Sequence, residues 1–143
     1  MNLPPNLHPA ARQSLAAWHV MVERKDFSEL DAIVHPDAVF RSPMAFTPYA
    51  SAPALLLILR TVMTVFQDFT YHREFGDGDG TSVVLEFSAK VGDRQLKGID
   101  MIRFDATGLI IEFEVMVRPL SGLQALGAEM GARLAQYLPA YKA

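Results

Sequence analysis

Residues 81–118 read TSVVLEFSAKVGDRQLKGIDMIRFDATGLIIEFEVMVR, and this stretch decides the fold. Apolar and polar side chains alternate along it with the two-residue period of strands that bury one face. The breaks at Gly92-Asp93 and Ala106-Thr107-Gly108 are too short to hold a crossover helix. The stretch therefore predicts three consecutive antiparallel strands, at 81–91, 94–104 and 109–118.

The same alternation begins earlier, at Phe69, and predicts a further strand at 69–75 before the turn at 76–80. Alternate residues of a strand share a face, which groups most of the apolar side chains of the four strands. We expect these groups to form one inner face, on which Asp100 is the acid. The groups are Val83, Leu85, Phe87 and Ala89; Asp100, Ile102 and Phe104; and Phe113, Val115 and Val117.

Upstream of the strands the apolar period changes to three and four residues, which predicts helices. A first helix runs from Pro9 to about Lys25 and a short second helix, with Leu30, Ile33 and Val34 on its buried side, ends at His35-Pro36. A short strand at 37–43 follows. Ser51 opens a third helix, through Gln67, that is apolar nearly all round, so it must pack on more than one side.

A last helix is predicted at about 120–138, with its apolar side made by Leu123, Leu126, Met130, Leu134 and Tyr137. Helices first and an antiparallel meander afterwards are typical of the α+β class. The length of 143 residues suits one domain, so we expect a single domain over 1–143. Its core is expected at about 10–119, with the helices on the concave side of the curved sheet.

Composition excludes several classes of function. The net charge is −3 and the 13 lysines and arginines form no run, which argues against a nucleic-acid partner. The longest apolar stretch, 54–59, is far shorter than the roughly 20 residues that span a bilayer. The first eight residues have no basic start followed by an apolar run, so we expect no signal peptide and a cytoplasmic location.

Metal and cofactor sites find no support in the sequence either. Cysteine is absent, which excludes disulfides and thiolate ligands. The four histidines, His8, His19, His35 and His72, lack the spacings that hold a metal ion. The glycines have neither the lysine nor the following helix of a phosphate-binding loop. We therefore expect no metal and no cofactor.

The order of the predicted elements and the phrase Gly98-Ile99-Asp100-Met101-Ile102-Arg103-Phe104-Asp105 resemble the nuclear transport factor 2-like superfamily. Its SnoaL-like cyclases and ketosteroid isomerases are the enzymatic branches that the chain resembles most. The resemblance covers about 10–119. It implies a cone-shaped, cystatin-like fold with a pocket at the wide end, commonly in a homodimer.

When the isomerase site is compared residue by residue, one of its functional residues is matched in this sequence and the others are replaced. Asp100 matches a protonated aspartic acid that donates to the oxyanion. Ser42, before Pro43, stands where the isomerase has its aspartate base, and Trp18 where it has a donor tyrosine. Val115 stands where the cyclases have an acid, and Glu112 and Glu114 point to the opposite face of the strand. The usual acid and base pair is therefore incomplete.

Asp100 is consequently the candidate catalytic residue, because burial raises the pKa of a carboxyl and can leave it a neutral donor. His19 is a second candidate, as a base that reaches the cavity. Alternatively, Asp100 forms an ion pair with Arg103 or His19, and Trp18 is an ordinary core residue. The expected ligand-binding residues are Trp18, Ser42, Phe87, Ile102, Phe104, Phe113, Val115 and Val117.

Two classes of function follow. The first is a small pocket protein that binds an apolar, carbonyl-bearing metabolite, with isomerase, cyclase or lyase chemistry through Asp100 as its enzymatic form. The second is a non-catalytic module that binds a ligand, forms dimers or docks a protein partner. A homodimer is expected in either class, because Ile99, Met101 and Met116 place apolar surface on the outer face of the sheet.

Overall fold

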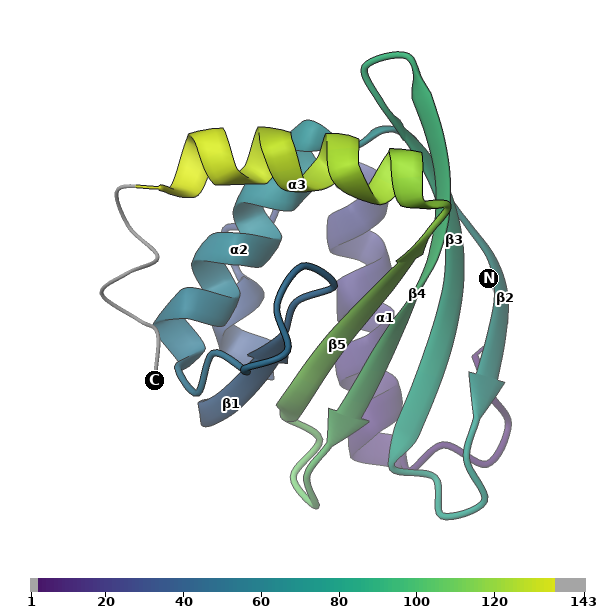
Figure 1. Ribbon diagram of the computed structural model, residues 1–143. Coiled ribbons are helices and arrows are strands. Elements are labelled where there is room, and N and C mark those ends of the chain that lie inside the picture. Colours follow the sequence, from purple (N-terminus) through teal and green to yellow (C-terminus); the bar gives the residue numbers. More distant parts are fainter. Residues whose placement is uncertain (1–2, 136–143) are drawn as a thin grey trace.

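The computed structural model describes residues 3–135, which form a five-stranded sheet with three α-helices on one face (Figure 1). The strands lie in the order β1-β5-β4-β3-β2. In chain order the elements are α1 (Pro9–Arg24), the 3₁₀ helix η1 (Leu30–Ile33), β1 (Val34–Arg41), α2 (Ala52–Val65), β2 (Gln67–Gly76), β3 (Ser82–Val91), β4 (Arg94–Phe104), β5 (Ile110–Arg118) and α3 (Leu120–Leu134).

The predicted meander is confirmed. Strands β2, β3, β4 and β5 pair in sequence order, and every pair is antiparallel. Leu85 lies opposite Asp100, and Asp100 lies opposite Val115, so the three predicted groups do share one inner face. Strand β1 adds an edge to this sheet by pairing in parallel with β5. The parallel pairing is possible because the connection between β1 and β5, which holds α2 and the strands β2 to β4, is long.

Only two of the three predicted N-terminal helices are α-helices. The expected second helix is a single 3₁₀ turn, and Val34 has an extended backbone with φ −113° and ψ 128°. Strand β1 therefore begins at Val34, which pairs with Ile110, and includes His35 and Pro36, which were expected to end a helix. A proline disfavours helical backbone before it and is tolerated in an edge strand, where a missing N–H leaves little unpaired.

The last helix docks as its apolar pattern requires. Leu126 and Leu134 are buried, and Gly122 lies so close to β4 that an added Cβ would stand 2.8 Å from the Cβ of Leu96. Helix α3 crosses α2 and covers the inner face of the sheet near the end of β5 (Figure 1). Tyr137, predicted on the same helical side, lies outside the described residues.

A bulge in β2 shapes the interior. Tyr71 lies opposite Phe87, and Glu74 lies opposite Leu85, so two residues of β2 face one residue of β3. A bulge of this kind shifts the alternation of the strand by one residue. Tyr71 and Glu74 therefore both face the helices, although strict alternation would turn Glu74 outward.

The outer face of the sheet carries no helix within residues 3–135 (Figure 1). At its centre Ile99 lies opposite Met116, and the exposed fractions of Met101 and Met116 are 36% and 45%. Arg73 and Lys97 hold Glu86 beside this apolar strip, and Arg41 and Arg103 hold Glu112. No helix of the described part of the chain is long and apolar enough to cross a membrane.

Candidate ligand-binding site

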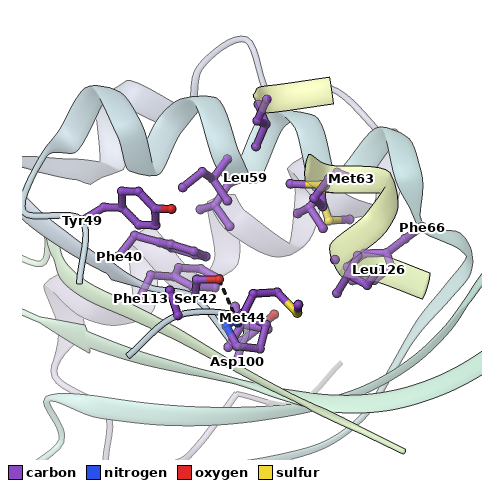
Figure 2. Close-up of a pocket in the computed structure, with 18 of the residues that line it drawn as sticks. Phe40, Ser42, Met44, Tyr49, Leu59, Met63, Phe66, Asp100, Phe113 and Leu126 are labelled. Atoms are coloured by element: carbon purple, nitrogen blue, oxygen red, sulfur yellow. Dashed lines mark hydrogen bonds between the residues drawn. The ribbon is translucent and has the colours of Figure 1, made fainter. Parts of the chain in front are cut away.

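A cavity of about 240 Å³ lies between the inner face of β4 and β5, the helices α2 and α3, and the loop that follows β1 (Figure 2). Its walls are mostly apolar. The polar side chains that reach it are Trp18, Ser42, Tyr49 and Asp100. Among the described residues that line it, Asp100 is the only one with a carboxyl, imidazole, amine or guanidinium group. Any acid or base chemistry in the cavity therefore centres on Asp100.

Asp100 is held by a relay of two hydrogen bonds. The Tyr71 hydroxyl donates to Oδ2 of Asp100 at 2.5 Å, and the indole Nε1–H of Trp18 donates to the Tyr71 hydroxyl at 2.9 Å. Trp18 and Asp100 are only 1% and 5% exposed. Since Tyr71 occupies Oδ2, a proton on the carboxyl resides on Oδ1, the oxygen left for a ligand.

Burial raises the pKa of Asp100 to about 7, although the hydrogen bond from Tyr71 lowers it. The pKa of Tyr71 is raised well above its ordinary value, first by burial and then by the neighbouring Asp100. Tyr71 is therefore a permanent donor in this relay. Asp100 in contrast exchanges its proton close to neutral pH, which is the range that a general acid or base requires.

The two ion pairs considered for Asp100 are wrong. Arg103 pairs with Glu112, at 3.7 Å, and His19 pairs with Glu74. The partner of Asp100 is instead the neutral hydroxyl of Tyr71. Because no cation of residues 3–135 pairs with the carboxylate, the buried charge is costly and the neutral form is favoured.

Four of the expected ligand-binding residues, Trp18, Ser42, Phe113 and Val115, line the cavity. Phe87, Ile102 and Phe104 are at most 2% exposed and lie in the packed core instead of the cavity wall. Phe87 stacks on Phe69 and fills the space beside Gly98, where an added Cβ would lie 2.5 Å from its ring. Val117 also lies outside the cavity, half-buried along the second part of the core.

Neither Ser42 nor His19 is placed to act as a base. The Ser42 hydroxyl accepts a hydrogen bond from the backbone N–H of Met44 at 3.0 Å, which shapes the loop. His19 does not line the cavity, and burial lowers its pKa while Glu74 opposes that shift. Within residues 3–135, no group of three or more His, Asp or Glu side chains is arranged to hold a metal ion.

Sequence reasoning missed Tyr71 and Glu74. Tyr71 carried a usable signal, since it lies two residues after Phe69 in a strand of period two and must share its face. Glu74 carried none, because its inward direction depends on the bulge in β2. Tyr71, which donates to Asp100, was thus recognisable as inward-facing, whereas Glu74, which pairs with His19, was not.

The site can be compared with solved structures. A steroid delta-isomerase from Pseudomonas aeruginosa is 63% identical, with a TM-score of 0.91 over 96% of this chain and 99% of that one. An uncharacterised protein with a cystatin-like fold from Silicibacter pomeroyi is 30% identical, with a TM-score of 0.83 over 96% of this chain and 94% of that one. A protein from Kribbella flavida, 17% identical with a TM-score of 0.67 over 85% and 97% of the two chains, shares the fold.

No curated protein matches the chain. The model of the SnoaL-like domain matches residues 11–113, which include most of α1, the four polar residues of the cavity and most of the sheet. The same span contains the Gly98–Asp105 phrase that first suggested this relationship. The chain therefore belongs to the SnoaL-like family.

Proposed function

We propose that the cavity binds a rigid, apolar small molecule whose carbonyl oxygen accepts a hydrogen bond from the neutral carboxyl of Asp100. The observation that carries this proposal is one buried carboxyl, oriented by Tyr71, in a wall that is mostly apolar. A site of this composition orients a ligand through its few polar groups and gains affinity from apolar contact. The similarity to a protein described as a steroid delta-isomerase supports a ring ketone as the ligand class.

A second candidate function is isomerisation of a double bond beside that carbonyl. Ser42 and Val115 stand where related enzymes have acids, so Asp100 would move the proton alone. The Asp100 carboxylate takes a proton from the carbon next to the carbonyl, which leaves a dienolate. The same proton returns to the far carbon, so the double bond moves into conjugation. The pKa of about 7 favours this role, since both forms of Asp100 are populated at neutral pH.

The dependence on pH distinguishes the two roles. If neutral Asp100 is the donor, affinity for progesterone is expected to fall as pH rises through about 7, by roughly tenfold or more when the hydrogen bond is lost. Trp18 is the only tryptophan of the chain and lines the cavity, so its fluorescence reports occupancy. Asp100→Asn is the matched control and is expected to bind with no such pH dependence.

Turnover would change with pH in the opposite direction. Isomerisation of 5-androstene-3,17-dione, followed by the absorbance of the conjugated enone, is expected to rise through the same pH range because the carboxylate is the base. If affinity falls as pH rises and no turnover is detected, the chain is assigned as a ligand-binding module. Absence of both binding and turnover with these ketones contradicts the proposed function.

We also propose that two copies of the chain associate through the outer sheet face. Ile99, Met101 and Met116 form a partly exposed apolar strip there, flanked by paired charges. Light scattering is expected to give twice the chain mass of 15.8 kDa. Met116→Lys is expected to give monomers, because a two-fold axis brings like charges together. Val20→Lys, at an exposed apolar position on α1, is the control that should leave the dimer intact.

A further inference from the structure

The side chain of Met44 reaches from the loop after β1 to helix α3. A Cβ added to Gly127 would lie 2.8 Å from Sδ of Met44 and closer still to its terminal methyl group. The thioether end of Met44 therefore fills the space that any side chain at 127 would need. A glycine inside a helix lowers stability by about 1 kcal/mol relative to alanine. The contact with Met44 is a physical reason for glycine at position 127 despite this cost.

Met44 also stands at the boundary between the cavity and solvent. It is one of the residues that line the cavity (Figure 2), yet 53% of its surface is exposed. A side chain that both lines a cavity and is half exposed lies at its mouth. Methionine is unbranched and turns about three side-chain bonds, so it is well suited to a wall that changes position.

Because the cavity is small, the position of Met44 affects the length of ligand that fits. Its volume of about 240 Å³ is just below the roughly 300–1,000 Å³ of typical small-molecule sites. With Met44 seated on Gly127, the cavity suits a short ligand. A longer ligand needs more room at the mouth, and Met44 can supply it by turning toward the solvent to which it is already half exposed.

We propose that Met44, seated on Gly127, determines the size of ligand that the cavity accepts. This inference rests on the proposed ligand-binding function. Removing the Met44 side chain opens the mouth to longer ligands and deprives short ones of a contact. Adding a methyl group at 127 takes the place of the Met44 thioether and displaces it toward the solvent to which it is already half exposed, so it acts in the same direction.

The test compares two ketones of different length, 1-tetralone with two rings and progesterone with four, by the fluorescence of Trp18. Met44→Ala is expected to shift the ratio of the two dissociation constants about tenfold in favour of progesterone, since the apolar contact of a half-buried methionine is worth roughly that much. Gly127→Ala is expected to shift the ratio in the same direction. The double variant should add little to Met44→Ala, because both changes remove the same seated side chain.

Gly131→Ala is the matched comparison, since Gly131 also lines the cavity from the same helix, and no atom of the described residues lies within 4 Å of the added methyl group. A larger shift of the ratio for Gly127→Ala than for Gly131→Ala supports the contact between Met44 and Gly127. Equal shifts in the two glycine variants, or an unchanged ratio in Met44→Ala, overturn the proposed role of Met44 and leave the proposed ligand site unaffected. If the unaltered chain binds neither ketone, the proposed function fails and this inference fails with it.

Discussion

Replacing Asp100 by asparagine is expected to raise the free energy of unfolding above about pH 8 by up to roughly 4 kcal/mol, and to change it little near pH 4. The pKa of Asp100 is raised from 3.8 to about 7 by burial. Between these two values the unfolded chain releases the proton that the folded chain keeps, so stability falls as pH rises. Above about 7 the folded carboxyl is ionised too and the loss levels off.

Asparagine avoids this cost because it never ionises, while its amide oxygen still accepts the Tyr71 hydroxyl. Chemical denaturation of both proteins across this pH range measures the difference. Asp93→Asn, in the exposed turn between β3 and β4, is the control and should alter stability little at any pH. If Asp100→Asn is several kcal/mol less stable than the unaltered chain at all pH values, Asp100 is not a carboxyl that is buried without an ion-pair partner.

Removing the Tyr71 hydroxyl, in Tyr71→Phe, is expected to cost about 2–4 kcal/mol of stability, since it leaves two buried groups unsatisfied. These groups are the indole N–H of Trp18 and Oδ2 of Asp100. Tyr49→Phe is the control for stability, because that hydroxyl bonds to no described residue. Thermal and chemical unfolding of the two variants should therefore differ clearly.

The same variant tests whether Tyr71 positions Asp100 or only fills space. The hydrogen bond from Tyr71 lowers the pKa of Asp100, so its loss raises that pKa further. The pH at which progesterone affinity declines is then expected to move upward, whereas a purely structural role would leave it in place. A stability loss with an unchanged midpoint would assign Tyr71 to packing alone.

Local pattern was enough to predict most of the fold. The turn at Gly92-Asp93 joins β3 to β4 in antiparallel pairing, because two residues cannot carry the chain to the other end of a sheet. Ser51 was recognisable as the start of a helix, and its hydroxyl accepts from the N–H of Ala54 at 3.2 Å. The prediction of the second helix was wrong because its few residues carry only a weak helical pattern. Pairing of the segment from Val34 onward with β5 outweighs that pattern.

The site was predicted less completely than the fold. Of the residues that we expected at the site, Trp18, Ser42, Phe113, Val115 and Asp100 line one cavity. The equally apolar Phe87, Ile102 and Phe104 do not, although the same alternation selects them. Alternation tells which face a residue occupies, but the helices that cover the face decide where space is left.

The sequence by itself determined the antiparallel meander, the inward direction of Asp100, and the absence of an acid at positions 42 and 115. These are properties of nearest neighbours along the chain. Only the tertiary structure decided that Tyr71 binds Asp100, that His19 turns to Glu74 and that Met44 rests on Gly127. Each of these contacts joins residues far apart in sequence, so packing of the whole chain decides it. The bulge in β2 turns Glu74 toward His19, and the docking of α3 brings Gly127 to Met44.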